Sequence, residues 1–169
     1  MADTLNTEVI IRPAREDEVS VVLGFVRELA EYERLSHEVV ATEDDMRKAL
    51  FGPRPYAEVV FACLEGEPVG FALFCYNFST FLAKPGIHLE DLFVRPACRG
   101  KGIGQRLLSW LARETIRRDC GRLEWAVLDW NAPSIKFYDS LGARALREWF
   151  SYRLTGEALD NVAGKNRAD

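Results

Sequence analysis

The sequence lacks the residues and patterns on which several classes of protein depend. It has two histidines that do not cluster and four cysteines without Cys-x-x-Cys spacing, so we expect no metal site and no disulfide framework. No apolar run approaches the ~20 residues of a membrane-spanning helix, so we expect no membrane association. A basic excess is also missing, since the net charge is −4, and this argues against a nucleic-acid-binding protein.

The N-terminal stretch and the overall composition indicate an ordinary soluble chain. Residues 1–8 are polar and acidic and lack the apolar segment of a signal peptide, so we expect a cytoplasmic protein. With 169 residues and 48% hydrophobic residues, the chain is long enough to bury one full core. We therefore expect a single domain over residues 1–169, with flexible ends at 1–7 and 165–169.

Hydrophobic periodicity predicts an α/β chain with a mixed sheet and helices on its faces. Residues 77–86 read as a loop, and Gly70 inside a strand suggests a bulge or a close backbone approach. The predicted strands are 9–13, 57–64, 69–76, 87–95, 123–128 and 145–154. The predicted helices are about 16–35, 42–51, 103–119 and a short one from about 132, followed by a polar tail from Thr155.

The most informative stretch is the glycine-rich turn at residues 99–104, which follows an apolar run and opens an amphipathic helix. Its glycines at alternate positions and the unpaired N–H groups of a helix start form a phosphate-binding arrangement. A Walker-type loop does not fit, because Arg95 stands where its first glycine is needed and Gly102 follows Lys101. A dinucleotide fingerprint fits poorly as well, because this turn comes late in the chain.

The residues from Val94 to Gly104 resemble the acetyl-CoA-binding motif of GCN5-related N-acetyltransferases (GNATs). A second block of that family appears at 131–138, and the resemblance covers roughly residues 8–155. It implies the GNAT fold, with a central mixed, largely antiparallel twisted sheet and helices on both faces. Shorter stretches resemble the diamine acetyltransferase branch, which includes the spermidine/spermine and thialysine enzymes; they are 11–14, 28–33, 89–94 and 127–131.

This resemblance implies a catalytic pair for transfer of an acetyl group from acetyl-CoA to a primary amine. Glu90 is the expected base, acting through water, and Tyr138 is the expected acid that protonates the leaving thiolate. His88 lies two residues from Glu90 and should face the same side of its strand. It is read either as a proton relay or as a hydrogen-bonded strand histidine.

The resemblance also implies two sets of binding residues and a homodimer. The expected acetyl-CoA-binding residues are Leu92, Phe93, Val94, Arg99, Gly100, Lys101, Gly102, Ile103, Gly104, Gln105, Asn131, Pro133, Ser134 and Tyr138. The expected residues of the amine acceptor site are Tyr32, Glu33, Glu90, Asp91 and Glu148.

Three hypotheses about function stay open at this point. The first is acetylation of a small amine, such as a diamine, a polyamine or a thialysine-like amino acid. Thr80 and Leu82 stand where the polyamine branch has an acidic residue and a tryptophan, which weakens a spermidine assignment. The second hypothesis is acetylation of protein lysines or other amines, and the third is a catalytically silent acyl-CoA-binding protein.

Overall fold

The computed structural model describes residues 8–164, which form two compact units with a boundary between Ala126 and Val127. Each unit is described by itself. The expected flexibility of residues 1–7 and 165–169 concerns residues outside the described range.

The first unit is built on a five-stranded sheet with the strands in sequence order. The first four strands pair antiparallel, and the fifth runs parallel to the fourth, so the mixed and largely antiparallel sheet that was predicted is confirmed. The strands are β1 (Val9–Pro13), β2 (Glu58–Leu64), β3 (Glu67–Ser79), β4 (Lys84–Val94) and β5 (Leu123–Trp125).

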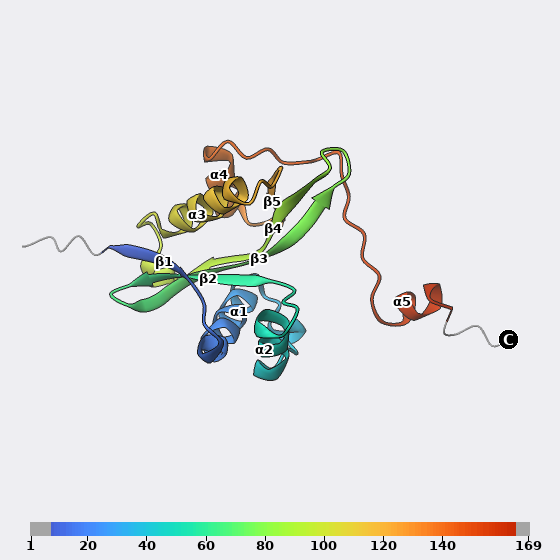
Figure 1. Ribbon diagram of the computed structural model, residues 1–169, viewed down its shortest axis with the longest axis horizontal. Helices are drawn as coiled ribbons and strands as arrows, with labels where there is room; N and C mark the ends of the chain where they lie inside the picture. The colour runs from blue at the N-terminus through green and yellow to red at the C-terminus, as the bar shows by residue number, and fades with distance from the viewer. Residues whose placement is uncertain (1–7, 165–169) are drawn as a thin grey trace, which may run out of the picture. The chain divides into compact units, whose positions relative to one another are not determined.

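Helices α1 (Val19–Glu33) and α2 (Glu43–Phe51) cover one face of this sheet, and α3 (Ile103–Arg117) covers the other (Figure 1). Short 3₁₀ turns lie at Glu16–Glu18, Ser36–Glu38 and Pro96–Cys98. A capping box starts α2, because the Thr42 hydroxyl accepts a hydrogen bond from the Asp45 N–H while the Asp45 carboxylate accepts one from the Thr42 N–H.

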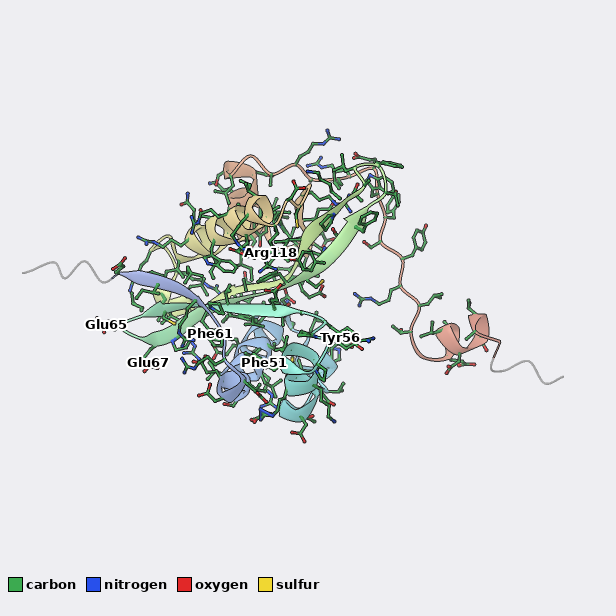
Figure 2. All side chains as sticks on the ribbon, viewed as in Figure 1. Phe51, Tyr56, Phe61, Glu65, Glu67 and Arg118 are labelled. Atoms are coloured by element: carbon green, nitrogen blue, oxygen red, sulfur yellow. The ribbon has the colours of Figure 1, made fainter. Side chains whose placement is uncertain are left out.

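A row of phenylalanines fixes the position of α1 on the sheet. The strand register places Phe61, Phe71 and Phe93 side by side on β2, β3 and β4. The ring of Phe25 from α1 lies 5.2–6.4 Å from the centroids of these three rings. All four rings are buried, and Figure 2 labels Phe61 on its strand. Because buried aromatic rings contribute large apolar areas, this cluster anchors the helix that carries Tyr32 and Glu33.

The strands around the predicted loop at 77–86 are longer than the sequence indicated. This loop prediction was wrong, because the β3–β4 ladder continues to the pair Ser79 and Lys84 and leaves only a short turn. Conversely, β5 ends at Trp125 instead of residue 128. The prediction for Gly70 is confirmed, since the β2–β3 register shifts beside its partner Ala62 and an added Cβ would lie 2.8 Å from the Phe93 carbonyl oxygen.

The second unit contains α4 (Ala132–Ser140) and α5 (Gly156–Val162). The predicted strand at 145–154 is wrong, because these residues form no regular structure. A strand needs a neighbouring strand for its N–H and C=O groups, and the described part of the second unit holds no other strand.

Candidate active site

A bulge in β4 places Glu90 at an irregular point of the sheet. Leu73 of β3 pairs with Asp91, but the next residue, Phe74, pairs with Leu89, so Glu90 is the additional residue. Its side chain is 61% exposed and its Oε2 lies 3.5 Å from His88 Nε2. The two side chains therefore face the same side, as predicted, and a proton on His88 would make them an ion pair.

The neighbouring carboxyl, Asp91, has a different environment from that of Glu90. Burial, which is the largest cause, and the negative charges of Glu90 and Glu33 together raise the pKa of Asp91 to about 6. Burial also raises the pKa of Glu33 on α1. Of the acceptor residues predicted from the sequence, Glu33 and Asp91 are thus brought close enough to influence each other.

Glu33 and Asp91 line a pocket of about 270 Å³ between α1, the segment that follows it and β4. A third carboxylate, Glu38, lines the same pocket and was missed from the sequence, where it lies in a stretch without a motif. The remaining lining residues are apolar; they are Val26, Leu29, Ala30, Leu35, Val39, Val40 and Ala41. A pocket with carboxylates on apolar walls suits a ligand that has an alkyl chain and a cationic group.

Beyond the bulge, β4 leaves one edge open in the first unit. β5 pairs only with Ile87–Leu89, so Leu92, Phe93 and Val94 have a paired strand on the β3 side alone. The main-chain groups of these residues on the other edge are placed to bind an extended ligand in the way that a neighbouring strand would. This arrangement fits the predicted cofactor role of these three residues.

The glycine turn adopts the conformation that its sequence requires. Gly100 and Gly102 have φ values of +76° and +74°, in the left-handed region that favours glycine. An added Cβ at either would meet nothing within 4 Å, so conformation and not crowding calls for these glycines. The first hydrogen bond of α3 runs from the Arg106 N–H to the Gly102 carbonyl oxygen. The N–H groups of Ile103, Gly104 and Gln105 precede it and have no partner within the helix. Ile103 is buried and anchors the start of α3, while Lys101 is exposed.

The Arg99 side chain points back toward α1. Its guanidinium carbon lies 4.7 Å from the centroid of the Tyr32 ring and 5.3 Å from that of Phe93. Its Nε donates a hydrogen bond of 2.8 Å to the Val94 carbonyl oxygen. Arg99 therefore joins a residue predicted for the acceptor site to residues predicted for the cofactor site.

The other predicted site residues lie in the second unit. The Asn131 side chain accepts a hydrogen bond of 3.3 Å from the Ser134 N–H and caps α4, and Pro133 stands in the first turn of that helix. Tyr138 follows Phe137 on α4, with their ring centroids 5.4 Å apart. Glu148 forms an ion pair of 3.1 Å with Arg144.

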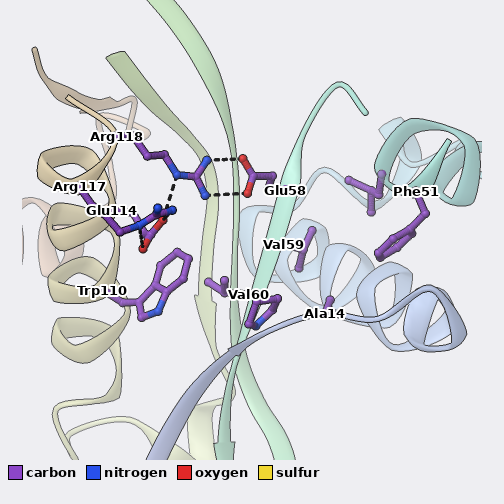
Figure 3. A pocket seen from close by; sticks show the side chains of 11 residues that line it. Ala14, Phe51, Glu58, Val59, Val60, Trp110, Glu114, Arg117 and Arg118 are labelled. Atoms are coloured by element: carbon purple, nitrogen blue, oxygen red, sulfur yellow. Dashed lines mark hydrogen bonds and ion pairs between the residues drawn. The ribbon is translucent and has the colours of Figure 1, made fainter. Parts of the chain in front are cut away.

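A second pocket, of about 350 Å³, lies between α2, the start of β2 and the C-terminal half of α3 (Figure 3). Its charged side chains are already paired: Arg118 binds Glu58 and Glu114, and Glu114 also accepts a hydrogen bond from Arg117. These ion pairs tie the end of α3 to β2. The charged side chains that line this pocket are therefore all paired with one another and offer no unpaired charge to a ligand.

Over the described range 8–164, no helix is both long and apolar enough to cross a membrane. In the same residues, no three or more His, Cys, Asp or Glu side chains gather where they could hold a metal ion. All four cysteines are free thiols.

Comparison with known proteins gives a family and close relatives. Residues 23–143 match the family described as Acetyltransferase (GNAT) family. The thialysine N-epsilon-acetyltransferase of Sus scrofa is 39% identical over 168 residues, which cover 93% of this chain and 98% of that protein. The L-ornithine N5-acetyltransferase NATA1 of Arabidopsis thaliana is 32% identical, with coverage of 90% and 86%. Among solved structures, an integron cassette protein from the mobile metagenome of V. cholerae superposes with a TM-score of 0.77 at 31% identity, covering 92% of this chain and 97% of that one.

Proposed function

Because the chain belongs to the GNAT acetyltransferase family and is an N-acetyltransferase, we propose that it acetylates a primary amino group of a small molecule that carries a second amino group. Thialysine, ornithine and short diamines are the candidate acceptors. The observation that carries this proposal is the pocket in which Glu33, Glu38 and Asp91 lie among apolar side chains. Asp91 directly follows Glu90, the additional residue of the β4 bulge. Relatives named for thialysine and ornithine, which both have two amino groups, support the same class of acceptor.

The acceptor amine has to lose a proton before it can attack. At pH 7 an alkyl ammonium with a pKa of ~10.4 is neutral in only about 1 of 2,500 molecules, a deficit of roughly 4.6 kcal/mol. Glu90 is the proposed base, and its exposed side chain can take the proton through water. The carboxylates of the pocket would meanwhile hold the second ammonium group, and so orient the first toward the bulge.

Acetyl-CoA supplies the activated acetyl group, and this chain offers suitable groups to hold it. The N–H groups from Gly100 to Gln105, at the start of α3, are proposed to bind the pyrophosphate. The open edge of Leu92–Val94 and the polar groups at Asn131 and Ser134 are proposed to hold the pantetheine arm. Main-chain N–H groups of the same β4 segment would stabilise the negative charge that develops on the thioester oxygen. Tyr138 is proposed to donate its hydroxyl proton to the leaving sulfur.

Three further proposals concern the whole molecule. We propose that both units belong to one acetyltransferase domain, supported by a family match that runs across their boundary from residue 23 to residue 143. Homodimer formation rests on the resemblance to the diamine acetyltransferase branch. A cytoplasmic location rests on the composition of the sequence.

The first test is release of CoA thiol from acetyl-CoA in the presence of matched amines. We expect thialysine, ornithine or 1,3-diaminopropane to react with a much lower KM than propylamine, which has one amino group. If propylamine reacts as well as the others, the acidic pocket does not select the acceptor. Preference for a lysine peptide would instead favour a protein substrate, and tight acetyl-CoA binding without any amine-dependent release would favour a silent binder.

The second test concerns the two proposed catalytic residues. Tyr138→Phe should lower kcat with little change in the affinity for acetyl-CoA, and an unchanged kcat would remove Tyr138 from the mechanism. Glu90→Gln should reduce activity most near neutral pH, where the amine is least deprotonated. A uniform loss at every pH would indicate a structural role. Glu31→Gln, an exposed change on α1, is the matched control and should leave both parameters unchanged.

A further inference from the structure

We propose that the Arg99 side chain is a positioning residue for the amine acceptor site, although it belongs by sequence to the cofactor-binding turn. In this role the guanidinium holds Tyr32, and through it the last turn of α1, against β4. The inference rests on the proposed function, because it assigns Tyr32 and Glu33 to amine binding.

The contacts of Arg99 are specific to a planar guanidinium. The guanidinium carbon lies over both the Tyr32 ring and the Phe93 ring, and the Nε–H donates a hydrogen bond to the Val94 carbonyl oxygen. A lysine ammonium at this position could approach a ring or a carbonyl, but it cannot stack on two rings and keep a directed Nε–H bond. Arg99 thus fills the junction between α1 and the end of β4 in a way that charge alone does not reproduce.

A second arginine makes a similar contact with an aromatic ring two turns back along α1. Arg95 forms an ion pair of 2.8 Å with Glu28, lies 4.6 Å from the Phe25 centroid and donates a hydrogen bond to the Pro68 carbonyl. Phe25, Glu28 and Tyr32 are spaced so that they lie on one side of the helix. The segment from Arg95 to Arg99 therefore holds α1 at two points, and the Arg99 contact is the one at the end of the helix.

The end of α1 is where such a contact has a consequence for the acceptor site. α1 finishes at Glu33, and Arg34 adopts the left-handed conformation that caps the helix, so its N–H bonds to the Glu31 carbonyl oxygen and the Leu35 N–H bonds to that of Ala30. Tyr32 precedes Glu33, which lines the pocket with Asp91. Fixing the Tyr32 ring against β4 therefore fixes the backbone from which Glu33 reaches the pocket.

A competing role for the guanidinium is direct binding of a cofactor phosphate. The two roles differ in which substrate is affected by substitution. Arg99→Lys keeps the positive charge that a phosphate needs but removes the planar stacking. If Arg99 positions Tyr32, this variant raises the KM for the amine by roughly 3- to 10-fold, with less than a twofold change in the KM for acetyl-CoA.

The experiment is a double-mutant cycle with Arg99→Lys, Tyr32→Leu and the double variant, in which the KM of each substrate and kcat are measured. We expect each single change to raise the amine KM and the double variant to be little worse than either single one, because both remove the same contact. Tyr32→Phe keeps the ring under the guanidinium, so Arg99→Lys should raise the amine KM in this background by the same factor as in wild type. Arg113→Lys, an exposed change on α3, is the matched control.

Several outcomes would overturn the inference. An effect of Arg99→Lys on acetyl-CoA alone would assign the guanidinium to the phosphate. Effects on the amine KM that multiply in the double variant would show that the two residues act independently. A wild-type protein that acetylates no amine would overturn the proposed function and this inference together. An active wild type with an unchanged amine KM in Arg99→Lys would overturn the inference alone. If Tyr32→Leu does not fold, as judged by circular dichroism, the effects of Arg99→Lys on the amine KM in the wild-type and Tyr32→Phe backgrounds still decide the matter.

Discussion

Replacing Asp91 by asparagine is expected to stabilise the protein at pH 8 and to change its stability little at pH 4. In the folded state burial, together with the charges of Glu90 and Glu33, raises the pKa of Asp91 from its ordinary value of 3.8 to about 6. As the pH rises, the unfolded chain therefore loses this proton first, and stability falls between about pH 4 and pH 6 and then stays level. Because one pKa unit corresponds to about 1.4 kcal/mol, ionised Asp91 costs about 3 kcal/mol at pH 8.

Asparagine has nearly the shape of aspartate and no charge, so Asp91→Asn removes most of this cost. The variant should gain about 2–3 kcal/mol at pH 8 and less than about 1 kcal/mol at pH 4, after allowance for hydrogen bonds that the amide does not satisfy. Urea unfolding followed by circular dichroism at a series of pH values measures both quantities. Glu90→Gln is the control, because Glu90 is exposed and its removal relieves only the smaller electrostatic part of the effect.

A stability difference between Asp91→Asn and wild type that stays constant from pH 4 to pH 8 would refute this reasoning. The same variant should lose acceptor affinity, because an ionised Asp91 is what attracts a second ammonium. Gain of stability together with loss of amine binding is the signature of a group kept for function at a cost in stability. Gain of stability with unchanged amine KM would remove Asp91 from the acceptor site.

Three further predictions test other parts of the structure. Arg118→Met should destabilise the protein by about 2 kcal/mol in urea unfolding, because it leaves Glu58 and Glu114 without their shared cation; equal stability would show that the cluster contributes nothing net. Gly70→Ala should cost about 1–3 kcal/mol in the same assay, since its Cβ would lie 2.8 Å from the Phe93 carbonyl oxygen. Gly102→Ala should raise the KM for acetyl-CoA more than that for the amine, because a φ of +74° costs an L-residue about 1–2 kcal/mol and the turn would change shape. Equal KM values for acetyl-CoA in wild type and this variant would show that the turn does not contribute to cofactor binding.

Local sequence patterns predicted the elements whose determinants are local. Pro13 ends β1, Thr42 and Asp45 cap α2, and the positive φ values at Gly100 and Gly102 match the need for glycine in the turn before α3. The short helix predicted from about residue 132 begins at Ala132, with Asn131 as its cap. Each of these features depends on residues within about four positions of one another.

Features that depend on a distant partner were missed or misjudged. The apparent loop at 77–86 contains Pro85 and Gly86, which normally interrupt strands, yet the β3–β4 ladder extends through both. The segment 145–154 has apolar residues typical of a strand, but a strand is stable only with a partner, and no strand pairs with it. Glu38 lines the same pocket as Glu33 and Asp91 only because the chain turns after α1, and no residue spacing in the sequence predicts that turn.

The adjacent residues Glu90 and Asp91 show what the sequence of a single strand can and cannot predict about a site. The family resemblance assigned both residues to the acceptor site, but the sequence could not say which of them is buried. The bulge at Glu90 is a property of β3 and β4 together, because it exists only where Leu73 and Phe74 pair with residues that are not neighbours. The burial of Asp91 depends in turn on α1, whose position is set by Phe25 against phenylalanines from three strands. Glu90 is therefore left open to water as a proposed base, whereas Asp91 is enclosed as a proposed ammonium ligand, and tertiary packing alone makes that division.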